Sequence, residues 1–62
     1  MIKTTRVAPG IYGFTFKGVG YEVELYEDGL WNSFQIRRDG DREYLQTYRT
    51  KGHAVRDIEA NA

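Results

Sequence analysis

The side chains best suited to catalysis are few in this sequence and fall on different segments. His53 is the only histidine, Ser33 is the only serine, and there is no cysteine. A nucleophile needs a base within hydrogen-bond reach, so a Ser33–His53–Asp57 triad would require two distant segments to converge. The spacing of His53 and Asp57 has a simpler explanation, because residues four apart on one helix form a surface pair. We favour the surface pair.

Two carboxylates on one segment are the other candidates for catalysis. Glu22 and Glu24 alternate with apolar residues in "YEVEL", so both point to the same side of a predicted strand. Paired carboxylates can divide acid and base roles or bind a hard cation, but acidic residues also line strand faces simply because these are exposed to water. The chain lacks phosphate-binding glycine motifs and the spacing of transition-metal sites. We therefore expect a protein that is not an enzyme and holds no metal and no cofactor.

The length and charge of the chain restrict its class. We expect residues 1–62 to form a single small domain. No apolar run is long enough to span a bilayer, and the N-terminus lacks the apolar core of a signal peptide, so we expect a cytoplasmic protein without membrane contact. Nine basic residues balance nine acidic ones, whereas nucleic-acid-binding domains usually carry a positive excess. The charge balance therefore counts against nucleic acid as a partner.

Segments rich in aromatic and β-branched residues, separated by glycine turns, predict an antiparallel sheet. The clearest strand is 21–26, and the turn at 27–29 leads to a second strand that begins at Leu30 or Trp31. The "RDGDR" turn leads to a third strand at 43–48, and "IYGFTF" at 11–16 predicts a fourth, edge-type strand. The side chains expected to face inward are Tyr21, Val23 and Leu25, then Phe34 and Ile36, then Leu45 and Thr47.

A C-terminal helix is predicted to follow Thr50. The Thr50 hydroxyl is suited to cap a helix N-terminus, and helical spacing relates Ala54, Val55, Ile58 and Ala62. Gly52 lowers the helix propensity of the first turn, so the helix needs to pack on the sheet to be stable. We therefore expect an α+β fold, a three- to four-stranded antiparallel sheet with one C-terminal helix packed on one face.

The side chains that alternate with the inward set define a predicted outward face of unusual composition. Exposed aromatic residues beside Arg and Gln are typical of interaction sites. Segment 11–16 also carries side chains suited to cover this face, so exposure and cover remain alternatives. The candidate binding residues are Tyr26, Trp31, Gln35, Arg37, Tyr44 and Gln46.

The stretch "WNSFQIRRDGDREYLQTYRTKGHAVRDIE", roughly half of the chain, resembles the three-stranded sheet and helix of AP2-type domains and of the arm-site-binding domains at the front of phage and transposon integrases. It also resembles small prophage domains with the same strand-turn-strand-helix ending. The matching positions are Trp31, Ile36, Arg37, Gly40, Tyr44, Leu45, Thr47, Tyr48, Thr50 and Ala54.

The resemblance implies a phage or mobile-element accessory protein whose sheet enters the major groove of DNA. Arg recognises guanine and Gln recognises adenine, so the outward face supplies base-contacting candidates. The candidates for phosphate contacts are Arg38, Arg42, Arg49 and Lys51. Glu22 and Glu24 would repel phosphate on that face. The alternative is a protein-interaction or inhibitor module that uses the same aromatic and Arg side chains, with homodimerisation as one form of it.

Overall fold

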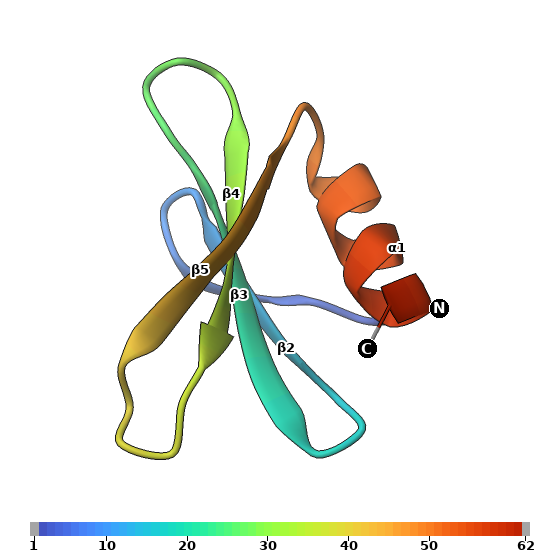
Figure 1. Cartoon of the computed structure of the whole chain (residues 1–62). Helices are drawn as coiled ribbons and strands as arrows, with labels where there is room; N and C mark the ends of the chain where they lie inside the picture. Colours follow the sequence, from blue (N-terminus) through green and yellow to red (C-terminus); the bar gives the residue numbers. More distant parts are fainter. Residues whose placement is uncertain (1, 62) are drawn as a thin grey trace.

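The computed structural model describes residues 2–61, which form one antiparallel sheet and one helix (Figure 1). The sheet has five strands in the order β1-β2-β3-β4-β5, and α1 stands against one of its faces. The prediction of an antiparallel sheet with a C-terminal helix is confirmed, but the strand number of three to four was wrong. The elements are β1 (Thr5–Ala8), β2 (Ile11–Phe16), β3 (Val19–Leu25), β4 (Trp31–Ile36), β5 (Arg42–Tyr48) and α1 (Lys51–Asn61).

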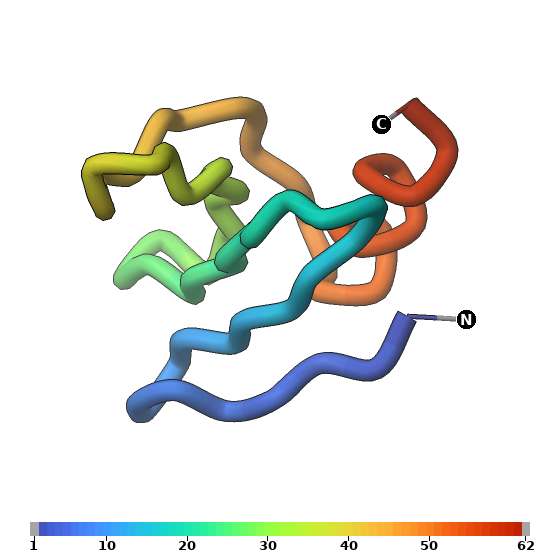
Figure 2. Tube along the Cα trace, turned by 90° about the horizontal axis from the view of Figure 1, so that it is seen from below, coloured from blue at the N-terminus to red at the C-terminus, as the bar shows by residue number. Residues whose placement is uncertain are grey.

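The additional strand is β1, which precedes the predicted N-terminal strand. It has only four residues, ends just before Pro9 and shows no alternation of apolar and polar side chains. Its pairing with β2 makes β1 the edge of the sheet, so the segment predicted as an edge strand lies inside it. Figure 2 shows β1 and β5 at opposite ends of the sheet.

The predicted glycine turns are present. Gly29 and Gly40 take φ values of 81° and 90°, in the left-handed region that glycine enters without steric cost. Each turn is closed by an aspartate whose carboxylate accepts a hydrogen bond from a backbone N–H two residues later, at 3.0 Å from Asp28 and at 3.0 Å from Asp39. The loops therefore fix which residues of neighbouring strands pair.

Strand pairing assigns every side chain to one of two faces, because directly opposite residues of antiparallel strands point to the same side. On the helix face, the face covered by α1, Tyr12 pairs with Val23 and Phe14 pairs with Tyr21. On the open face, opposite the helix, Glu22 pairs with Phe34. The buried core lies between the helix face and α1 and consists of Phe14, Tyr21, Val23, Tyr48, Ala54, Val55 and Ile58.

The helix begins and packs as predicted. The backbone N–H of His53 donates to the Thr50 hydroxyl at 3.1 Å, which confirms the N-cap. Ala54, Val55 and Ile58 are buried against the sheet, and Ala62 lies outside the described residues. Among residues 2–61, no helix is long and apolar enough to cross a membrane.

The predicted direction of the side chains was correct for β3 and wrong for β4. The loop at 26–30 pairs Leu25 with Trp31, so Trp31, Ser33 and Gln35 lie on the helix face. Ser33 is fully buried there. Phe34 and Ile36, predicted inward, lie on the open face, where Phe34 is buried without any contribution from the helix. Phe34 and Ile36 thus do not mark the side on which the helix packs.

A β-bulge changes the alternation within β5. Ser33 pairs with Gln46 and the adjacent Phe34 pairs with Tyr44, so Leu45 is an extra residue on β5. Leu45 lies on the predicted side, where it lines a groove beside α1, but it is exposed and does not belong to the core. The inward prediction was wrong for Thr47, which pairs with Asn32 on the open face. The outward prediction was wrong for Gln46, which shares the helix face with Ser33.

Candidate binding site

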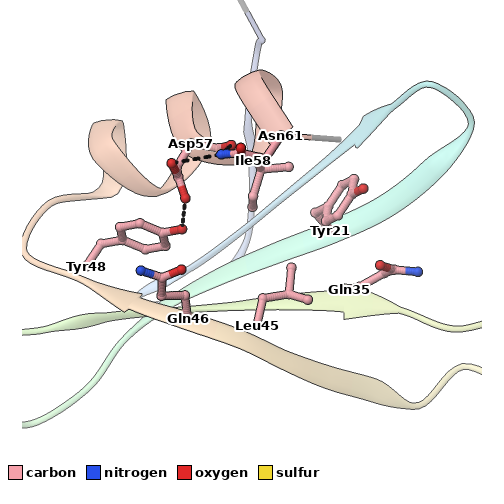
Figure 3. A pocket seen from close by; sticks show the side chains of 8 residues that line it. All are labelled: Tyr21, Gln35, Leu45, Gln46, Tyr48, Asp57, Ile58 and Asn61. Carbon is pink, nitrogen blue, oxygen red and sulfur yellow. Dashed lines mark hydrogen bonds between the residues drawn. The ribbon is translucent and has the colours of Figure 1, made fainter.

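A groove lies between β5 and α1 on the helix face of the sheet. It has a volume of about 450 Å³ and opens beside the edge strand. Figure 3 shows Leu45 and Gln46 rising from β5 towards α1, with Asp57 and Asn61 on the facing side of the helix. We call this the β5 groove, and its lining residues are Tyr21, Gln35, Leu45, Gln46, Tyr48, Asp57, Ile58 and Asn61.

The bulge in β5 is held in place by a buried hydroxyl. Ser33 donates to the backbone carbonyl oxygen of Gln46 at 2.8 Å and accepts from the N–H of the same residue at 3.1 Å. These two bonds replace ladder bonds that the extra residue would otherwise leave unmade. Because Leu45 and Gln46 both lie opposite Ser33, the bulge directs both side chains into the β5 groove.

A fixed carboxylate forms the helix side of the groove. Asp57 accepts a hydrogen bond from the Tyr48 hydroxyl and another, at 3.0 Å, from the side-chain amide of Asn61 (Figure 3). Burial raises the pKa of the Tyr48 phenol to about 12, and the hydrogen bond to Asp57 and the charge of that carboxylate act in the same direction. Tyr48 therefore remains a hydrogen-bond donor at neutral pH, and the direction of the Asp57 carboxylate is set by two neutral donors.

The groove has a negative charge without a matching cation. Within residues 2–61, no Lys, Arg or His forms an ion pair with Asp57. The predicted pair with His53 is not formed, because the His53 ring lies against the Tyr48 ring with the centroids 5.0 Å apart. Glu43 lies on the same face, opposite Gln35. The side-chain amides of Gln35 and Gln46 make no hydrogen bond to another described residue, so these donors and acceptors are free for a ligand.

The other flank of α1 is filled by the chain itself. Ile2, ahead of β1, packs against the hydrophobic core, and Lys51 donates to the Thr4 hydroxyl at 3.4 Å. The Lys51 ammonium also lies 4.0 Å from the centre of the Tyr12 ring. A smaller space of about 210 Å³ remains there, bordered by Ile2, Thr4 and Val55 among others. An extended segment thus occupies the β1 flank, whereas the β5 flank is open.

The open face is organised by Arg42. Its guanidinium lies 3.7 Å from the centre of the Phe34 ring and forms ion pairs with Glu22 at 3.2 Å and with Glu24 at 2.8 Å. Tyr44 meets the same phenyl ring edge-on, with the centroids 6.0 Å apart, and remains 55% exposed. Arg42, predicted to contact phosphate, is thus used within the sheet to cover an aromatic ring and pair two carboxylates.

The residues predicted to form one outward face are divided among several places. Gln35 and Gln46 both line the β5 groove, while Tyr44 is on the open face. Trp31 is half-buried on the helix face, with its ring centroid 6.0 Å from that of Tyr12, so β2 covers it in part. Most of the remaining candidates lie in exposed loop positions, namely Tyr26, Arg37, Arg38 and Arg49. Lys51 is the first residue of α1.

The groove residues that were not among the candidate binding residues are Tyr21, Leu45, Tyr48, Asp57, Ile58 and Asn61. Asp57 and Asn61 are four residues apart, a spacing that places them on one side of a helix next to Ile58. That spacing was the available signal, but it identifies a site only when the helix side that faces the edge strand is known. A search against models of protein families finds no match, and searches of curated proteins and of solved structures also return none.

Proposed function

We propose that this chain is a non-enzymatic protein-interaction module that binds its partner on the β5 side of the molecule. The single observation that carries the proposal is an edge strand, exposed from Arg42 to Gln46, next to a groove with free amide groups. Edge strands of this kind bind extended protein segments, and adjacent pockets receive the side chains of the partner.

The distribution of charge favours a protein over nucleic acid as the partner. The open face, the part of the sheet free to enter a DNA groove, carries Glu22 and Glu24, and its central cation is already paired with both. The β5 groove contains the carboxylate of Asp57. A phosphate backbone would be repelled at both places, because its binding depends on unpaired Lys and Arg.

Nucleic-acid binding by a phage or mobile-element accessory protein is the second candidate, and one observation favours it. Arg37 and Arg38 are exposed on the β4–β5 hairpin and form no ion pair with another described residue. Two cations at a hairpin tip suit contacts to phosphate, which position a protein without reading sequence. In this second candidate function, the β4–β5 hairpin contacts the nucleic acid in place of the predicted outward face.

Site-specific photo-crosslinking in the native cells separates the two candidates. A photoreactive residue in place of Gln46 is expected to capture a protein product of defined mass, because this side chain lines the β5 groove. The matched control replaces Thr15, an exposed residue of β2 whose partner Gly20 places it on the open face. Equal capture from both positions, or capture of nucleic acid alone together with salt-dependent binding of labelled duplex DNA, would overturn the proposal.

A further inference from the structure

The outer edge of β5 has unused backbone hydrogen-bonding groups. β5 pairs only with β4, and among residues 2–61 no other strand or loop bonds to its outer side. Five consecutive residues, Arg42 to Gln46, are exposed, and the strand contains no proline. A partner strand can therefore add to this edge through main-chain hydrogen bonds without displacing any part of the domain.

The β1 flank of the same helix shows what kind of segment fits beside α1. There the chain places an extended segment next to the helix, with Ile2 packed against the core and Thr4 bonded by Lys51. The β5 flank offers the equivalent elements, with Leu45 and Ile58 as apolar wall and Asp57 as the polar group (Figure 3). An extended segment is thus a form of occupant that this fold already accepts on the other side.

The charge of the β5 groove specifies the chemistry of that segment. Asp57 is oriented by Tyr48 and Asn61, neither of which neutralises it, and the second carboxylate on this face, Glu43, forms no ion pair within residues 2–61. Among these same residues, no Lys or Arg lines the groove. A cationic side chain is the complement of such a site, and alternate side chains of an added strand point to one side, where they can enter the groove.

We infer that the β5 edge and the β5 groove bind an extended segment of a partner protein as a sixth strand, with a Lys or Arg side chain of that segment paired to Asp57. This inference rests on the proposed function and specifies its ligand. The apolar neighbours of the basic residue in the segment pack on Leu45 and Ile58, and the free amides of Gln35 and Gln46 bond the exposed main chain or side chains of the segment.

Blocked eight-residue peptides that alternate threonine and valine around one central residue provide the probe. The central residue is lysine, norleucine or glutamate, and binding is followed through the backbone amide NMR signals of the full chain. The lysine peptide is expected to shift signals of β5 and of Asp57 to Asn61, and to bind about fivefold more tightly than the norleucine peptide, which corresponds to about 1 kcal/mol. The glutamate peptide is expected to bind more weakly than both.

Two charge-removing variants on opposite sides of α1 test the role of the carboxylate. Asp57→Asn keeps a hydrogen-bond acceptor for Tyr48 and is expected to abolish the preference for lysine over norleucine. Glu59→Gln removes the same charge from the β1 flank of the same helix and is expected to leave the preference unchanged. Methylating alternate peptide nitrogens tests the strand pairing, because only one of the two alternating sets faces the β5 edge.

Several results would overturn the inference. These are the absence of shifts on β5 with all three peptides, equal affinity of the lysine and glutamate peptides, or tolerance of both methylation patterns. Concentration-dependent shifts of β5 without peptide would show that a second copy of the chain occupies the edge, which also contradicts it. The proposed function fails independently, because it depends on cross-linking from Gln46 to a protein of any chemistry.

Discussion

The two edges of the sheet differ in how the chain protects them. β1 has four residues, a bulge between Arg6 and Ala8, and a proline at its end. β5 has seven residues and no proline, and its bulge is bonded inside the sheet by Ser33. Short, irregular edges with proline resist pairing with other chains, whereas a longer edge invites it.

The two flanks of α1 also differ, because one is covered by the chain and the other is open. On the β1 side, Ile2 and Thr4 contact the core and α1, so that this side is closed by the molecule itself. On the β5 side, Leu45 is 40% exposed next to a groove. Exposure at β5 is therefore not a general property of so small a domain, because the chain closes one edge and leaves the other available.

Replacing Ser33 with alanine is expected to cause the largest loss of stability, because Ser33 holds the bulge of the β5 edge. The change removes the hydroxyl of the fully buried Ser33 and leaves the N–H and the carbonyl oxygen of Gln46 without their partner in a partly buried position, which costs about 1 kcal/mol or more of unfolding free energy. Chemical denaturation measures the loss, and the backbone amide of Gln46 is expected to exchange with solvent faster than its neighbours.

Thr15→Val is the matched control, because it removes a hydroxyl from an exposed strand position where the side chain makes no hydrogen bond to a described residue. Its unfolding free energy is expected to change by less than about 0.5 kcal/mol. Equal stability of Ser33→Ala and Thr15→Val would show that the bulge does not depend on the Ser33 hydroxyl.

Truncating one apolar side chain on each flank of α1 gives the next largest effect. Ile2→Ala removes a partly buried side chain from the closed flank and is expected to cost about 1 kcal/mol. Leu45→Ala on the open flank is expected to change the unfolding free energy by less than about 0.5 kcal/mol, because its side chain contributes more to the groove surface than to the core. Thermal or urea denaturation of both variants checks the difference.

An equal or larger loss of stability in Leu45→Ala would mean that the β5 flank is part of the packed core, like the β1 flank. A loss of peptide binding in Leu45→Ala at unchanged stability would show that Leu45 serves the ligand and not the core.

Local patterns predicted the elements but not the way in which the sheet faces the helix. The Gly turns, the Thr50 cap and the alternation in β3 depend on residues close in sequence, and the structure confirms them. The direction of the β4 side chains depends on the pairing of Leu25 with Trp31. Both faces of the sheet contain large apolar residues, so hydrophobicity alone does not select the buried side.

The candidate site was only partly predictable for the same reason. Gln35 and Gln46 belonged to the predicted set, but the bulge at Leu45 shifted the alternation within β5 and separated Gln46 from Tyr44. No local residue pattern predicts this bulge, because Ser33 on another strand holds it in place. Asp57 was assigned to a pair with His53, since the sequence does not show that Tyr48 reaches the helix.

The smallest expected effect is a change in stability that comes from Tyr48, which lines the β5 groove, and it appears only at high pH. The pKa of the Tyr48 phenol is about 12 in the folded chain, compared with 10.0 when unperturbed, so the folded state holds this proton more strongly than the unfolded state. The resulting stabilisation is complete below about pH 10 and is lost as the pH rises through about 12. Phenolate formation would also place two negative groups side by side at Asp57.

Tyr48→Phe removes this titration, so the stability difference between the parent chain and the variant is expected to shrink as the pH rises from about 9 to about 11.5, as measured by urea denaturation. Tyr26→Phe is the matched control, because Tyr26 is 45% exposed and its hydroxyl has no hydrogen bond to a described residue. A parallel loss of stability in the parent chain and Tyr48→Phe would mean that the phenol does not hold Asp57. The carboxylate would then lack the fixed orientation that distinguishes the open flank from the closed one, where Lys51 holds Thr4 in place.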